Sequence, residues 1–135
     1  MKPREPARGG VSPADFRRLA LALPEAVELP HFDNPSFRAR GKIFATLSEE
    51  NRRGVVKLTA EQQEVMTSAE PKIFASVPAW GKHGWTYLHL AFADADTVRG
   101  ALLTSWRNVV PKKLAAEHAA LPPTKIPAKR TRSKA

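Results

Sequence analysis

The chain has 135 residues and a mass of 14.9 kDa, which is enough for one domain with a single hydrophobic core. It contains no cysteine, and this excludes disulfides, thiolate zinc sites and cysteine nucleophiles. It has no apolar run of about 18 residues and no apolar N-terminal signal, so we expect a cytoplasmic protein without a membrane partner.

The formal net charge of +9 lies mainly at the two ends of the chain. Residues 1–10 carry three basic side chains and one acidic, and residues 122–135 carry five basic side chains and no acid. The residues between them hold 14 basic and 12 acidic groups. We therefore predict a mobile basic N-terminal arm (1–10), one globular domain (11–121) and a disordered basic C-terminal tail (122–135).

The first half of the domain predicts one helix followed by short strands. Ser12 caps a helix that begins at Pro13, with an apolar stripe that reaches Leu23. Strands are predicted over residues 26–29, 35–40, 43–48 and 55–58. The last three of these strands form a meander, because turn-forming residues separate them.

The second half of the domain alternates helices and strands. A helix is predicted over 59–68, apolar at Val65, Met66 and Ala69, then an edge strand over 72–77, an inner strand from Trp85 to Phe92, and helices over 94–109 and 111–120. The glycines at 81 and 84 predict a tight loop before the inner strand. This order predicts an α+β fold with two layers, an antiparallel sheet with helices on one face and a partly open second face.

Several short segments occur in a characteristic order over roughly residues 12–118. They are Pro35–Arg38, Gly41–Ala45, Val56–Leu58, Gly81 with Gly84–Thr86, and Ser105–Arg107 followed by Val109 and Lys112. Together they resemble the MmcQ/YjbR family of small bacterial proteins, although Trp106 replaces a common tyrosine and Pro111 interrupts an often continuous helix. The resemblance implies a fold related to secretion chaperones and a double-wing DNA-binding role. It supplies no catalytic residue.

The cations that could contact DNA lie on two turns, on one strand and in the tail. Flexible cations on protruding turns are suited to phosphate contacts. The turns at 38–42 and 49–54 lie at opposite ends of one strand, about 20 Å apart. The candidate nucleic-acid-binding residues are Arg38, Arg40, Lys42, Arg52, Arg53, Lys57, Lys125, Lys129, Arg130, Arg132 and Lys134. The alternative, which is the commoner behaviour of charged turns, is that they only keep the surface soluble.

A second candidate site is one face of the inner strand. It would consist of Trp85, Tyr87 and His89, joined by Arg38, Arg40 and Lys57 if the meander brings them to the same face. Aromatic rings among cations stack the bases of single-stranded nucleic acids. The third helix could instead cover this face through Trp106. Because large aromatic side chains are usually buried, we expect Trp85 to belong to the core.

No other constellation predicts chemistry. His31 and Asp33 lack a third metal ligand nearby, and the serines lack the motif of a nucleophile. We therefore expect no metal, no cofactor and no catalytic site. The resulting hypothesis is a non-enzymatic binding protein that takes DNA with little sequence preference through its tail and turns. The alternative is a protein- or small-ligand-binding module that uses the open sheet face, and in both cases we expect a monomer or a weak dimer.

Overall fold

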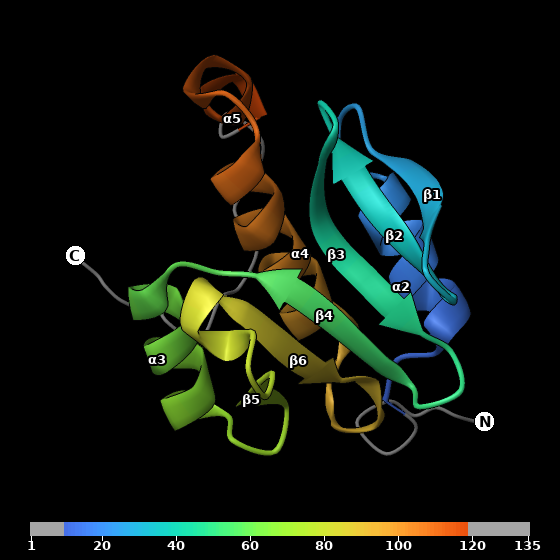
Figure 1. Cartoon of the computed structure of the whole chain (residues 1–135), viewed down its shortest axis with the longest axis vertical. Helices are drawn as coiled ribbons and strands as arrows, with labels where there is room; N and C mark the ends of the chain where they lie inside the picture. Colours follow the sequence, from blue (N-terminus) through green and yellow to red (C-terminus); the bar gives the residue numbers. More distant parts are fainter. Residues whose placement is uncertain (1–9, 119–135) are drawn as a thin grey trace.

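Six antiparallel strands form one sheet in the order β1-β2-β3-β4-β6-β5, as shown by a computed structural model that describes residues 10–118 (Figure 1). The strands are β1 (Val27–His31), β2 (Asn34–Ala39), β3 (Lys42–Ser48), β4 (Arg53–Lys57), β5 (Phe74–Ser76) and β6 (Trp85–His89). The helices are α2 (Pro13–Leu21), α3 (Ala60–Ala69), α4 (Ala95–Val109) and α5 (Lys112–His118), with 3₁₀ turns η1 (Gly81–His83) and η2 (Leu90–Phe92). This architecture confirms the predicted α+β fold.

The helices begin where the sequence predicts. The side chains of Ser12, Thr59 and Asp94 each accept a hydrogen bond from the backbone of the first turn of α2, α3 and α4. Thr59 and Gln62 complete the predicted capping box. Each such cap stabilises its helix by about 1 kcal/mol, because it satisfies a backbone N–H that has no partner within the helix.

The meander of β2, β3 and β4 contains a β-bulge between β2 and β3. Phe37 pairs with Ala45 and Arg38 pairs with Ile43, so Phe44 is the extra residue on β3. Its carbonyl oxygen accepts a hydrogen bond from the hydroxyl of Ser105 on α4. The same hydroxyl accepts one from the backbone N–H of Lys57 at 3.1 Å, so α4 is fastened to β3 and β4 together.

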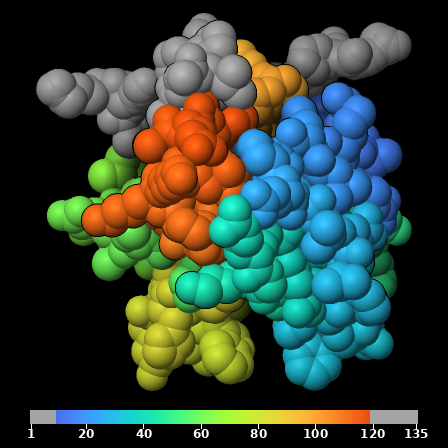
Figure 2. Space-filling view, turned by 90° about the horizontal axis from the view of Figure 1, so that it is seen from above, coloured from blue at the N-terminus to red at the C-terminus, as the bar shows by residue number. Residues whose placement is uncertain are grey.

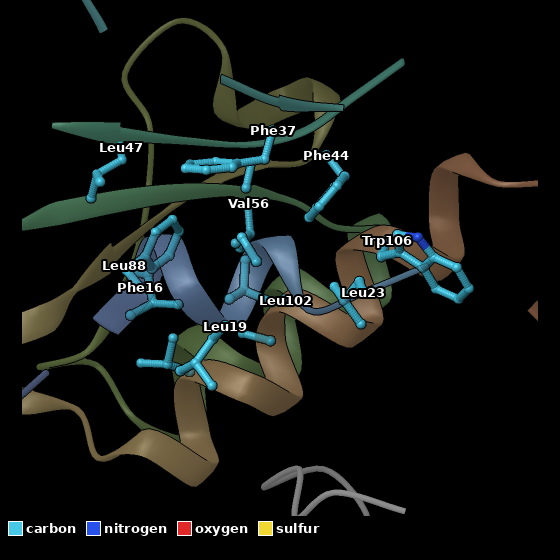
Figure 3. Packing of buried hydrophobic residues seen from close by; sticks show 14 of the residues in the cluster. Phe16, Leu19, Leu23, Phe37, Phe44, Leu47, Val56, Leu88, Leu102 and Trp106 are labelled. Atoms are coloured by element: carbon cyan, nitrogen blue, oxygen red, sulfur yellow. The ribbon is translucent and has the colours of Figure 1, made fainter. Parts of the chain in front are cut away.

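The hydrophobic core lies between the sheet and helices α2 and α4 (Figure 3). Phe16 of α2 packs edge-on against Phe37, with 5.9 Å between ring centroids. Gly54 leaves space for the ring of Phe16, because a Cβ at position 54 would lie 2.5 Å from that ring. Trp106 of α4 is fully buried, and its indole N–H donates to the carbonyl oxygen of Pro24 at 2.9 Å.

Three local predictions were wrong. β1 continues through Pro30, which pairs with Pro35, instead of ending before it. The missing N–H of proline is tolerated because β1 is an edge strand. Val65 is 41% exposed, since α3 packs mainly through Met66. The inner strand ends at His89, and Phe92 in η2 is 60% exposed.

The predicted basic arm and tail lie almost wholly outside the described residues. At the start of the described part, the backbone N–H of Val11 donates to the carbonyl oxygen of Leu90 at 2.9 Å. Over residues 10–118, no helix has the length and apolar character that crossing a membrane requires.

Candidate functional site

The strand register brings aromatic and basic side chains together on β4 and β6. Trp85 lies opposite Lys57, and His89 lies opposite Arg53. Tyr87 lies between them on the same face, because alternate residues of a strand share a face. All five are half-buried, as is Val55 on the same face of β4, whereas the residues that alternate with them on the two strands are buried. These five side chains and Arg38, on the side of the sheet opposite α2 and α4, are called the open face below, and Figure 1 looks onto it.

Two of the rings are each covered by a cation. The guanidinium carbon of Arg53 lies 4.1 Å from the centroid of the Tyr87 ring, and the amine of Lys57 lies 4.7 Å from the Trp85 ring. Such contacts are worth about 0.5–1 kcal/mol each at exposed sites. They hold two positive charges in place at the two ends of β4, beside two π surfaces.

Arg38 belongs to the same face. Its Nε donates to the hydroxyl of Ser36 at 3.1 Å, and Ser36 pairs with Thr46, which in turn pairs with Val55 of β4. Arg40 does not belong to it, because it lies in the turn after β2 and forms an ion pair with Glu25. Of the three cations expected to share the face, the register therefore brings in Arg38 and Lys57 and leaves Arg40 out.

Acidic side chains are almost absent from the sheet, although they are common elsewhere in the domain. Residues 10–118 hold 14 basic and 12 acidic side chains, yet strands β2 to β6 contain no aspartate or glutamate. The only acid in the sheet is Glu28 of the edge strand β1, which accepts a hydrogen bond from Arg17 of α2 at 3.0 Å. The open face therefore has three fixed cations with no carboxylate on the strands that carry them.

His89 and Arg53 differ in their electrostatic environment. Burial, and secondly the charge of Arg53, hold the pKa of His89 below its ordinary value, so its ring is neutral at pH 7. The Nε atom of Arg53 is buried and has no hydrogen-bond partner among the described residues. An unsatisfied buried donor at this position is compatible with a site that completes its contacts through a ligand.

The expectation that Trp85 belongs to the core was wrong. Trp85 is half-buried on the open face, while Trp106 and α4 pack against the other side of the sheet. The inward positions of β6 are filled by Thr86 and Leu88, which are fully buried. Alternation along the strand then places Trp85 and Tyr87 outward.

The remaining sequence candidates are spread around the domain. Lys42 is exposed at the start of β3, and Arg52 lies in the β3–β4 turn, where its Nη2 donates to the carbonyl oxygen of Val11 at 3.4 Å. The two turns lie at opposite ends of β3, as predicted. The five tail cations, Lys125, Lys129, Arg130, Arg132 and Lys134, lie outside the described residues.

The open face is recessed between two projections (Figure 2). The yellow projection contains η1, and the light-blue one contains the β1–β2 turn. Each carries an exposed aromatic residue, Trp80 at 59% exposure and Phe32 at 92%. Neither ring was part of a predicted site; the available signal was an aromatic residue in a loop segment rather than on a strand.

Metal binding finds no support in the described part of the chain. Over residues 10–118, no three histidine, aspartate or glutamate side chains lie close enough to hold an ion. His31 packs against the ring of Phe32, with centroids 4.6 Å apart. A separate hollow of about 690 Å³ between α3, α4 and α5 has a mixed lining that includes Val65, Arg107 and Lys112.

Comparison with known proteins gives a family but no activity. The sequence model of the YjbR family matches residues 21–108, more than half of the chain. No curated protein sequence matches significantly. The crystal structure of Deinococcus radiodurans protein DR2400, which has the family domain DUF419, is similar with a TM-score of 0.68 and 20% identity. The match covers 90% of this chain and 96% of that one, and it concerns the fold.

Proposed function

This chain belongs to the YjbR family, which is not a known enzyme family, and we propose that it is a binding protein that holds single-stranded nucleic acid on its open face. Phosphate groups contact Arg38, Arg53 and Lys57, and bases stack beside Trp85 and Tyr87. The chain performs no chemical step on this ligand. The basic tail adds affinity without determining where the strand lies.

One observation carries this proposal: cations and rings are paired on strands that contain no acid. A positively charged groove with aromatic platforms is the arrangement by which proteins hold single strands without reading their sequence. Stacking contributes about 1–3 kcal/mol per base, and each neutralised phosphate adds a salt-dependent term. The rest of the described domain is almost electrically balanced, so the open face is where an anionic polymer is favoured.

The same geometry favours a single strand over a duplex. Trp85 and Tyr87 belong to the open face, so a ligand must offer the faces of its bases to stack there. The bases of a duplex are stacked on one another and do not offer their faces. A duplex would rely on the turns, where Arg40 is already paired with Glu25 and Arg52 is accompanied by Glu49 and Glu50. DNA binding through these turns as wings is therefore the weaker form of the proposal.

A binding titration with two matched variants tests the proposal. A labelled oligothymidylate of about 12 nucleotides is titrated against the full chain at several salt concentrations. If three face cations neutralise phosphates, they contribute about 2 to the slope of log affinity against log salt. Arg53→Gln with Lys57→Gln should make the slope shallower by about 1.4 and weaken binding.

The control variant is Arg40→Gln with Lys42→Gln, which removes the same charge from the β2–β3 turn. It should keep most of the affinity, because these residues do not lie on the open face. An equal loss in both variants would mean that overall charge decides binding. A loss in the turn variant alone would favour the wings. Absence of salt-dependent binding would leave a protein or an uncharged small molecule as the partner of this face.

A further inference from the structure

Trp80, just before η1, is exposed without a structural reason on the described part of the chain. Its side chain is 59% exposed, and its ring lies 6.4 Å from that of His83 in a tilted arrangement. Tryptophan usually buries most of its surface, and exposed tryptophans are concentrated at binding surfaces. An aromatic ring left in water on a folded loop is thus a candidate contact residue.

The loop that carries Trp80 is held rigidly. The carbonyl oxygen of Val77 accepts from the backbone N–H of Trp80 at 3.2 Å and from that of Gly81 at 2.6 Å. Gln63 of α3 donates to the carbonyl oxygen of Gly81 at 3.0 Å and also contacts Thr86 of β6. The loop is therefore anchored to both a helix and a strand, so its ring is displayed on a fixed support.

The backbone on either side of Trp80 is under constraint. Ala79 has φ +69°, a left-handed conformation that is unfavourable for a residue with a Cβ. Gly84 has φ +96°, and a Cβ there would lie 1.9 Å from the carbonyl oxygen of Leu58. The left-handed Ala79 and Gly84 therefore lie at either end of the η1 segment, which projects on the open side of the sheet (Figure 2).

The two projections beside the open face differ in charge. Residues 77–84 contain Lys82 and no acid, and the chain runs from them directly into Trp85. At the other projection, Phe32 is followed by Asp33. The hollow beside it is lined by Glu28, Glu49 and Glu50 together with Arg17, which pairs with Glu28 and Glu49, so acids still outnumber cations there. A polyanion leaving the open face is attracted towards η1 and repelled from the β1–β2 turn.

We propose that the nucleic-acid site extends from the open face onto the η1 loop, where Trp80 stacks a base and Lys82 contacts its phosphate. This inference rests on the proposed function, and it defines the ligand as a single strand of at least three consecutive unpaired nucleotides, one for each of Trp80, Trp85 and Tyr87. Phe32, although more exposed, is outside the site. The ligand therefore crosses the sheet in one direction only, away from the acidic projection.

The test compares three single variants of the full chain with the same labelled oligothymidylate. Trp80→Ala should lower the affinity about 5- to 150-fold, as expected for the loss of one stacked base, and leave the salt slope unchanged. Lys82→Gln should make the slope shallower by about 0.7. Phe32→Ala is the matched control, an exposed aromatic on the opposite projection, and should bind like the wild type. Melting temperatures should stay unchanged for all three, because these side chains are exposed.

The outcomes separate this inference from the proposed function. If the wild type binds and the Arg53→Gln with Lys57→Gln variant is weakened, the open face is the site. Wild-type affinity for Trp80→Ala would then overturn the extension to η1 while leaving the open face in place. Equal losses for Trp80→Ala and Phe32→Ala would overturn the directional path. A wild-type chain that does not bind the oligonucleotide would overturn both proposals.

Discussion

The placement of two tryptophans on opposite sides of one sheet can be tested through stability. Trp106→Ala removes a fully buried side chain and its hydrogen bond to Pro24, which should cost about 3–5 kcal/mol. Trp85→Ala removes a half-buried ring and its contact with Lys57. The cation–π contact is worth about 0.5–1 kcal/mol and the partial burial about 1 kcal/mol, so the total is about 1.5–2 kcal/mol.

Thermal unfolding followed by circular dichroism distinguishes these magnitudes. At about 4 °C per kcal/mol for a domain of this size, Trp106→Ala should lower the melting temperature by about 12–20 °C and Trp85→Ala by about 6–8 °C. The Trp85 variant should also lose about 1–3 kcal/mol of single-strand affinity while remaining folded. Equal destabilisation by both substitutions would refute the assignment of Trp85 to the open face. Unchanged affinity would remove its ring from the site.

Two further predictions concern the tail and the pH dependence of stability. A chain that ends at Leu121 loses five cations, and if all of them contact phosphates its salt slope for a single strand should become shallower by up to about 3.5; an unchanged slope would exclude the tail from binding. The pKa of His89 is lowered in the native state, first by burial and then by Arg53. As the pH falls below about 6.5, His89 therefore takes up a proton in the unfolded chain before it does so in the native chain. Stability measured by urea unfolding should therefore decrease from pH 7 towards pH 5.5, and less steeply in His89→Gln; parallel curves for the two proteins would contradict this linkage.

The parts of the fold that were predictable from sequence are those determined by neighbouring residues. The caps at Ser12, Thr59 and Asp94 depend on hydrogen bonds within one helical turn. The β2–β3 hairpin was predicted from the glycine at 41, although the turn lies at the left-handed residues Arg40 and Gly41, one residue earlier than the predicted 41–42. Such local preferences can be read directly from the order of the residues.

The composition of the site could be predicted only in part. Alternation showed that Trp85, Tyr87 and His89 share a face, but it does not say which side of the sheet the helices cover. That depends on long-range packing, here the insertion of β6 between β4 and β5 and the burial of Trp106 against the far side. The pairing of Arg40 with Glu25 is equally non-local, because 15 residues separate them.

The proline pair in β1 and β2 also affects how readily the sheet can pair with a strand from another molecule. In the described part of the chain the two outer strands are β1 and β5, and an outer strand with free backbone groups can recruit a strand from another molecule. Val27 and Leu29 make β1 apolar and exposed, which would favour such recruitment. Pro30, the fourth of the five residues of β1, removes a backbone donor from this strand, and β5 spans only three residues. Both margins of the sheet are therefore poor templates for another strand, and the protein can keep a wide sheet surface accessible with little tendency to polymerise through its edges.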